Sequence, residues 1–151
     1  HRLYTLVNTA GRSRASYLSA WDADKWRLER TRRICSRPAT VLAVSERGDA
    51  LAIGTSDLAL HVLSTHARCA PLVRVANVHD FPPTCVAFSP SGTHVVSGSA
   101  DSSLRLIELP AGGGSGAGGA HIGVLVDHGH LLYALLFVVA LLVALAAMRL
   151  T

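Results

Sequence analysis

Two stretches of the sequence decide the fold: PATVLAVSERGDALAIGTSDLALHVL at 38–63 and PPTCVAFSPSGTHVVSGSADSSLRLI at 82–107. They align without a gap at an offset of 44 residues, and many further positions keep their apolar character. Such a repeat predicts two copies of one structural unit. The identical pairs are Pro38/Pro82, Thr40/Thr84, Ala43/Ala87, Ser45/Ser89, Gly48/Gly92, Gly54/Gly98, Asp57/Asp101 and Leu60/Leu104.

Each copy has the pattern of three short strands joined by turns. In the second copy we expect strands at 84–88, 94–99 and 104–109. Pro and Gly occupy turn-favouring places in its SPSG segment, and SERG takes the same place in the first copy. Residues 71–78 predict a fourth strand that connects the copies. Four strands in a period of about 44 residues are typical of a blade of a WD-repeat β-propeller.

Polar residues at particular places support this interpretation. His79 precedes the second copy, and Asp101 lies in the turn between its second and third strands. In WD repeats, such a His, a Ser or Thr on a strand and such an Asp form a buried hydrogen-bonded network. The expected members here are His79, Ser97 or Ser99, and Asp101.

The third strand of the second copy lacks the Trp that completes such a network, and Leu106 or Ile107 lies near that place. A His, a Ser and an Asp could also form a hydrolase triad. These residues fall at framework positions, however, and the sequence contains no G-x-S-x-G motif. We therefore predict no catalytic, cofactor-binding or metal-binding residues, no cofactor, and no enzymatic chemistry.

The N-terminal third is expected to form a partial blade. A strand at 16–22 ends in the Trp21-Asp22 pair that gives WD repeats their name, and strands at 3–8 and 26–33 flank it. The predicted fold is all-β, about two and a half WD-repeat propeller blades, followed by one transmembrane α-helix. The predicted boundaries are 1–110 for the partial propeller (blade repeats at 38–78 and 82–109), 111–130 for a Gly-rich tether and polar collar, 131–148 for the transmembrane helix and 149–151 for a short tail.

Closure of the propeller ring is a separate question. The chain opens at His1 and not at Met, which suggests a C-terminal fragment of a longer protein. The second copy has no evident outer strand after Leu109. Because a propeller ring closes when N-terminal and C-terminal strands share one blade, we expect a strand from before His1 to complete it. The fragment alone is not expected to close its ring.

An uncharged apolar segment, LLYALLFVVALLVALAAM, begins at Leu131 and ends at Met148. A helix of this length spans roughly 27 Å, close to the hydrocarbon thickness of a thin bilayer. A buried globular helix would show a polar face, and this segment has none. We therefore expect a single membrane span. Arg149 by itself favours a cytosolic C-terminus.

The segment before the span is rich in glycine. AGGGSGAGGAHIG at 111–123 contains a formal G-x-G-x-x-G, but no amphipathic helix of a dinucleotide site follows it. Its composition favours a flexible tether. His121, Asp127, His128 and His130 come next. They could form a metal site, but an interfacial polar collar is the preferred interpretation.

Charge and cysteines bear on partners and compartment. The net charge of +4 comes mostly from KWRLERTRRICSR at 25–37. This run could bind nucleic acid or acidic lipid, but its alternation favours the solvated face of an outer strand and a loop. The spacing of Cys35, Cys69 and Cys85 indicates neither a zinc site nor a disulfide framework. Free thiols suit a reducing compartment, which favours cytosolic blades.

Blades, a tether and a C-terminal span together resemble the Sec-twelve family, the ER-anchored guanine nucleotide exchange factors for the Sar-type small GTPase. The likeness is carried by SYLSAWDADKWRLERTRRIC at 16–35, VLAVSERGDALAIGTSDLALHVL at 41–63 and VRVANVHDFPPTCVAFSPSG at 73–92. Animal members have a similar YL-x-AWD strand, VSE-x-G turn, G-T pair and A-H-x(4)-T-x-VAF run. The resemblance covers residues 4–148.

The resemblance implies a single-pass ER membrane protein whose propeller faces the cytosol. Its partner would be the Sar-type small GTPase, from which it would release GDP to start COPII vesicle budding, without covalent chemistry. In this family the loop that engages the GTPase and binds a potassium ion belongs to the N-terminal half of the propeller. That half is not in this sequence, so no exchange-site residue can be assigned.

Other functions compete with nucleotide exchange. The main alternative is a membrane-tethered WD-repeat protein-interaction scaffold without exchange activity. Nucleic-acid binding through 25–37 and an enzyme acting on small molecules are less favoured. We therefore expect neither nucleic acid nor a small-molecule substrate as a partner.

Overall fold

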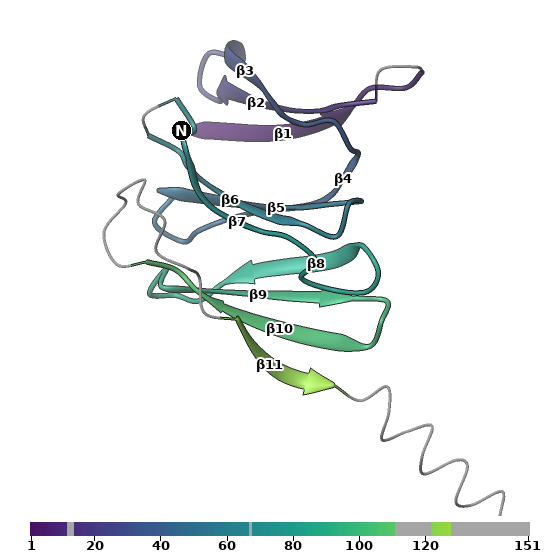
Figure 1. The fold of residues 1–151 in the computed structure, drawn as a ribbon. Coiled ribbons are helices and arrows are strands. Elements are labelled where there is room, and N and C mark those ends of the chain that lie inside the picture. The colour runs from purple at the N-terminus through teal and green to yellow at the C-terminus, as the bar shows by residue number, and fades with distance from the viewer. Residues whose placement is uncertain (12–13, 67, 111–121, 128–151) are drawn as a thin grey trace, which may run out of the picture.

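The computed structural model describes residues 1–11, 14–66, 68–110 and 122–127. These residues form three antiparallel β-sheets that stack one above another (Figure 1). The strand order is β1-β2-β3 in the first sheet, β4-β5-β6-β7 in the second and β8-β9-β10-β11 in the third. The strands are β1 (Arg2–Asn8), β2 (Ser16–Asp22), β3 (Arg27–Cys35), β4 (Ala39–Val44), β5 (Ala50–Thr55), β6 (Leu60–Ser64), β7 (Pro71–Val75), β8 (Pro83–Phe88), β9 (His94–Ser99), β10 (Ser103–Glu108) and β11 (Ile122–Asp127).

The two sequence copies form the second and third sheets, so the predicted strands are confirmed. The first copy supplies β4, β5 and β6, the second supplies β8, β9 and β10, and β7 lies between them. The first sheet is the predicted partial blade, with three strands among the described residues. Its β2 ends in the Trp-Asp pair, and the Trp21 indole N–H donates to Thr5 Oγ1 at 2.9 Å.

The core lies between the sheets, and β5 shows how the sequence builds it. Side chains alternate between the two faces of a strand, and every residue of β5 is buried. Leu51 and Ile53 pack toward the first sheet, in a cluster with Leu18 of β2. Ala50 and Ala52 belong to the cluster shared with the third sheet. The middle sheet is therefore covered on both faces, which explains its near-continuous apolar sequence.

The paired residues of the repeat include those that make its turns. The Oγ atoms of Ser45 and Ser89 accept hydrogen bonds from backbone N–H groups across the turn, at 3.0 Å and 3.1 Å respectively. Gly48 and Gly92 have φ angles of +71° and +73°, in the left-handed region that favours glycine. The serine and the glycine recur because each hairpin needs both.

A second glycine pair recurs because the backbone is crowded. A Cβ atom on Gly54 would lie 2.7 Å from Val41 Cγ1 and 2.9 Å from Cβ of Pro83 in the next sheet. A Cβ atom on Gly98 would lie 2.7 Å from Cys85 Sγ. Gly54 therefore makes room for the neighbouring sheet, and Gly98 makes room for side chains of the adjacent strands in its own sheet.

The structure corrects the expectation for the outer strand of the third sheet. Residues Ile122–Asp127 form β11, which pairs antiparallel with β10 from Ser103↔Asp127 to Ile107↔Ile122. From the sequence, these residues are expected in the tether and collar, and a strand from before His1 is expected at this edge. The physical reason for the difference is that IGVLVD is rich in β-branched and apolar residues and can satisfy the open edge of β10.

The remaining predictions for the C-terminal part are not tested by the fold. The segment from Leu131 to Met148 lies outside the described residues, as do 111–121 and 128–130 of the tether and collar. Within the described ranges, no helix has the length and apolar character needed to cross a bilayer.

Candidate functional site

The polar network predicted from the second copy is present beside β8. His79 Nε2 lies 2.9 Å from Ser97 Oγ on β9, and its Nδ1 lies 2.8 Å from Ser103 Oγ at the start of β10. The Ser103 hydroxyl donates to Asp101 Oδ1 at 2.7 Å. The backbone N–H of Asp80 donates to Asp101 Oδ2 at 2.8 Å. Three segments of the third sheet are thereby joined around one imidazole.

These hydrogen bonds determine where the protons lie. Because the Ser103 hydroxyl donates to Asp101, its oxygen accepts from the Nδ1–H group of His79. His79 Nε2 then holds a lone pair that accepts the hydroxyl proton of Ser97. The imidazole is neutral in this arrangement. Burial lowers the pKa of His79, and the Asp101 carboxylate, 3.2 Å from Nδ1, opposes that effect only in part.

The carboxylate of the network has the opposite preference. Burial alone would raise the pKa of Asp101, but the Ser103 hydroxyl and the backbone N–H groups of Ser103 and Asp80 outweigh burial and lower it to about 2. A buried carboxylate that accepts several hydrogen bonds stays ionised. The network is therefore an ionised carboxylate and a neutral imidazole in a closed structural unit.

The hydrolase alternative does not survive this geometry. The His79 side chain is 0% exposed and Ser97 is 0% exposed, so no substrate reaches either side chain. The prediction of His79, Ser97 and Asp101 as network members is confirmed. Ser99, the alternative member, donates instead to the Phe81 carbonyl at 2.9 Å.

Sequence reasoning missed Ser103, although a hydroxyl two residues after the turn aspartate was a usable signal. Ile107 occupies the third strand near the place of the missing Trp and is fully buried in the core between the second and third sheets. Ser103 therefore completes the hydrogen bonds of the network, and the apolar packing of Ile107 occupies the region where a Trp side chain is expected in WD repeats.

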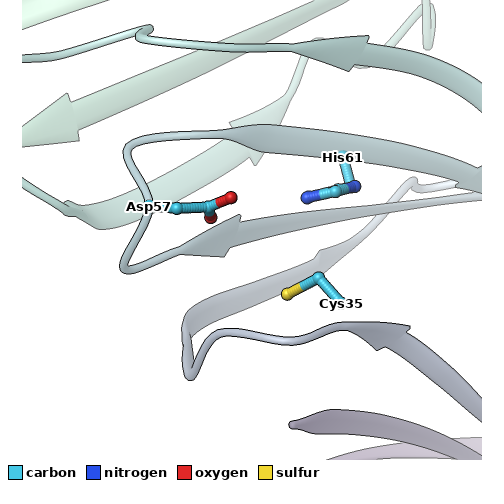
Figure 2. A group of neighbouring side chains, drawn as sticks. All are labelled: Cys35, Asp57 and His61. Carbon is cyan, nitrogen blue, oxygen red and sulfur yellow. The ribbon is translucent and has the colours of Figure 1, made fainter. Parts of the chain in front are cut away.

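The second sheet carries different chemistry at the matching place. At the offset of 44 residues, Cys35, which precedes the first copy at the end of β3, corresponds to His79, and Asp57 corresponds to Asp101. Figure 2 shows the sulfur of Cys35, the carboxylate of Asp57 and the ring of His61 turned toward one region between the sheets. Their candidate ligand atoms all lie within 4.8 Å of one another. His61 Nε2 is buried and has no hydrogen-bond partner among the described residues, a state that costs about 1–3 kcal/mol.

Four loops at one end of the sheets are joined by hydrogen bonds, and we call them the loop face. It consists of residues 36–38, 56–59, 76–82 and 100–102. The Ser56 N–H donates to the Pro38 carbonyl at 2.8 Å, and the Val78 N–H donates to the Leu58 carbonyl at 2.9 Å. The network around His79 joins the last two loops. Phe81 projects from this face with 57% of its surface exposed.

The basic run is located on β3, the outer edge strand of the first sheet. Its first five residues are all exposed, which confirms the interpretation as a solvated outer strand. Arg32 is half-buried, and its guanidinium donates to the carbonyls of Arg68 and Cys69. All three cysteines, Cys35, Cys69 and Cys85, are free thiols.

Comparison with known proteins agrees with this architecture. Residues 71–108 match the family model described as WD domain, G-beta repeat. The matched segment runs from β7, the outer strand of the second sheet, through β8, β9 and β10 of the third. The described sheets are WD40 blades. A search of curated proteins finds no match to the chain.

Proposed function

We propose that this chain is part of a membrane-anchored guanine nucleotide exchange factor that activates a Sar-type small GTPase at the ER membrane to start COPII vesicle budding. The observation that carries the proposal is the order of parts: WD40 blades followed by an uncharged apolar segment of 18 residues that begins at Leu131. The motifs at 16–35, 41–63 and 73–92, which resemble those of the Sec-twelve family, support the proposal.

Exchange of this kind works by differential binding. A factor that binds the nucleotide-free GTPase more tightly than the GDP-bound form shifts the population toward the empty state. By thermodynamic linkage, the nucleotide then weakens binding of the factor by the same ratio. The blades suit this task because each is packed against its neighbour and offers rigid loops. The residues that open the nucleotide pocket are not assigned to any position of this chain.

The loop face is the surface that we expect to contact a protein partner. Its loops are held by backbone hydrogen bonds and by the closed network of His79, so little ordering is needed on binding. Phe81 is an exposed aromatic side chain with its carbonyl fixed by Ser99. Exposed aromatic residues on a rigid surface are typical anchors of protein interfaces.

The proposal is tested by nucleotide release. The full-length protein that contains this chain, in micelles or in a bilayer disc, is mixed with a Sar-type GTPase loaded with a fluorescent GDP analogue, and release is followed after adding excess GTP. We expect release to accelerate in proportion to the concentration of the full-length protein, and an Arf-type GTPase serves as a specificity control. Release at the intrinsic rate over the whole concentration range would contradict the proposed exchange activity.

The alternative is a membrane-tethered scaffold, favoured by the match to a WD40 repeat, a module that usually presents protein-binding surfaces. Binding separates the two functions. A scaffold binds the GTPase, or another partner, without changing its nucleotide release rate.

Replacing Phe81 by Ala should weaken partner binding about 30-fold if this side chain is an anchor worth about 2 kcal/mol. Trp26→Ala is the matched control, because Trp26 is 75% exposed but lies in the turn between β2 and β3, outside the loop face. It should leave partner binding unchanged.

A further inference from the structure

The cluster of Cys35, Asp57 and His61 lies where two blades meet. Cys35 ends β3 of the first sheet, Asp57 lies in the turn between β5 and β6, and His61 is on β6 of the second sheet. Figure 2 shows the carboxylate of Asp57 and a ring nitrogen of His61 facing each other, with the sulfur of Cys35 beside them. One ligand atom from each residue lies within 4.8 Å of the other two. A thiol, an imidazole and a carboxylate therefore converge from two sheets.

The imidazole is the observation that requires an explanation. His61 is 9% exposed, and its Nε2 atom has no hydrogen-bond partner among the described residues. Buried polar atoms in native proteins are nearly always paired. Burial, and then the nearby charge of Arg74, lower the pKa of His61, so the ring is neutral at physiological pH. A neutral imidazole with a free lone pair is the form that binds metal ions.

The next blade shows what this place holds when its role is only structural. There the Ser97 and Ser103 hydroxyls close the hydrogen bonds around His79. Their counterparts in the second blade are Ile53 and Ala59, which have no hydroxyl. The second blade keeps the turn carboxylate but loses both hydroxyl partners. Asp57 is bonded instead to Thr55 and Arg74, and Cys35 Sγ lies 3.2 Å from Ser16 Oγ and donates to the Arg37 carbonyl. Only the His61 ring nitrogen Nε2 is left without a partner among the described atoms of the three.

We propose that Cys35, Asp57 and His61 bind one divalent transition-metal ion, Zn²⁺ by the chemistry of the donor set, with solvent at the fourth position. Thiolate and imidazole donors select zinc-like ions over Mg²⁺ and Ca²⁺. Zinc bonds of 2.0–2.3 Å place tetrahedral ligand atoms about 3.6 Å apart. Because the three atoms lie within 4.8 Å of one another, they need to approach by at most about 1 Å. A cavity of about 370 Å³ lined by all three residues gives the ion a path from solvent.

The existing partners of the ligands are compatible with a bound ion. The Asp57 Oδ1 atom accepts the Thr55 hydroxyl at 2.5 Å, a bond that can orient the carboxylate from the outer side. Cys35 Sγ donates to the Arg37 carbonyl at 3.1 Å and releases that proton when it binds metal. Arg74 is the competitor, since its Nη2 atom lies 3.4 Å from Asp57 Oδ2. Its side chain is 53% exposed and can turn into solvent.

A protease-like Cys-His-Asp triad is less consistent with these contacts. In such a triad the histidine is hydrogen bonded to both the thiol and the carboxylate. Here His61 Nε2 has no such bond among the described residues, and the Cys35 thiol donates to a backbone carbonyl. Convergence without mutual hydrogen bonds is what a shared cation would satisfy.

The experiment titrates the full chain with Zn²⁺ alone in competition with a chromophoric chelator. Replacing Cys35 by Ser, Asp57 by Asn or His61 by Gln should each weaken binding of one Zn²⁺ by about 10-fold or more. Arg74→Gln should strengthen it, because the competing charge is removed. Cys85→Ser, a change at an exposed thiol outside the cluster, is the matched control and should leave the affinity unchanged.

Cobalt reports the ligands directly. Co²⁺ in place of Zn²⁺ should give a thiolate-to-metal charge-transfer band that Cys35→Ser abolishes and Cys85→Ser retains. A Co²⁺ complex without that band, or with a band that survives in Cys35→Ser, would overturn the proposal.

Labelling of the unmodified chain guards against a variant that fails to fold. Zn²⁺ should slow alkylation of Cys35, read by mass spectrometry, and leave Cys85 labelling unchanged. An equal rate for Cys35 with and without Zn²⁺ would equally overturn the proposal.

Discussion

Replacing Asp101 by Asn is expected to remove the charge that holds the His79 network together. In the native chain the carboxylate accepts the Ser103 hydroxyl at 2.7 Å and the backbone N–H of Asp80 at 2.8 Å. An asparagine keeps one oxygen for Ser103. Its amide nitrogen, however, places a donor opposite the N–H of Asp80, so that amide loses its acceptor.

The magnitude follows from the pKa of the carboxyl group. Its pKa falls from the ordinary value of 3.8 to about 2 in the folded chain. Each pKa unit corresponds to 1.36 kcal/mol, so the charged form contributes about 2 kcal/mol. The side chain is 8% exposed, so solvent screening takes away little of this value. An unpaired N–H adds to the loss, and we expect the variant to lose roughly 2–3 kcal/mol of unfolding free energy at pH 7.

The assay is urea unfolding of the full chain followed by circular dichroism, with free energies from linear extrapolation. Asp80→Asn is the matched control, because Asp80 is an exposed neighbour on the same loop, and it should change stability by less than about 0.5 kcal/mol. Since the pKa of Asp101 is lowered, its contribution is complete above about pH 4 and is lost as the pH falls toward 2. The gap between native chain and variant should therefore narrow below pH 4. A variant as stable as the native chain at pH 7, or a gap that stays constant down to pH 3, would refute the reasoning.

Three further perturbations test other parts of the fold. Gly54→Ala should lower the free energy of unfolding by about 1–3 kcal/mol, because its Cβ would lie 2.7 Å from a neighbouring side chain. This loss should exceed that of Gly92→Ala, where only the φ of +73° is strained and no atom lies within 4 Å. The urea midpoints of the two variants test the prediction. Lowering the pH from 7 to 5 should destabilise the chain, because burial lowers the pKa values of His79 and His61 and the unfolded chain then binds protons that the folded chain does not; a flat urea midpoint over this range would contradict it. Val124→Pro should weaken pairing of β11 with β10 and speed hydrogen exchange of β10 amides, whereas unchanged exchange would mean that β11 does not protect that edge.

The repeat allowed most of the strands to be predicted, because residues with a structural role are the same in both copies. Ser45 and Gly48 form a turn, and Gly54 makes room for the next sheet, so the same residue types occur 44 positions later. The outer strand β11 has no such counterpart. Its IGVLVD sequence lies between a glycine-rich stretch and an apolar segment, and no repeat marks it. Its pairing with β10 is visible only in the tertiary structure.

The candidate site divides in the same way. His79, Ser97 and Asp101 were predicted because WD repeats place such residues at known positions. The cluster of Cys35 and His61 was not, because its members come from different sheets and no short spacing joins them. The number and spacing of the cysteines argue against common zinc motifs. They do not indicate which thiol lies near which imidazole across the interface between two blades.

In both blades a loop is held against a turn of the loop face, but by different chemistry. This links the metal proposal to the interaction surface. In the third blade the hydrogen bonds from His79 to Asp101 pin the loop at 76–82 to the turn at 100–102. In the second blade a Zn²⁺ ion on Cys35 and Asp57 would pin the loop at 36–38 to the turn at 56–59 in the matching position. Both pairs of loops belong to the loop face. Partner binding at the loops near Cys35 should therefore depend on metal, while binding centred on Phe81 should not, since its loop is closed by hydrogen bonds alone.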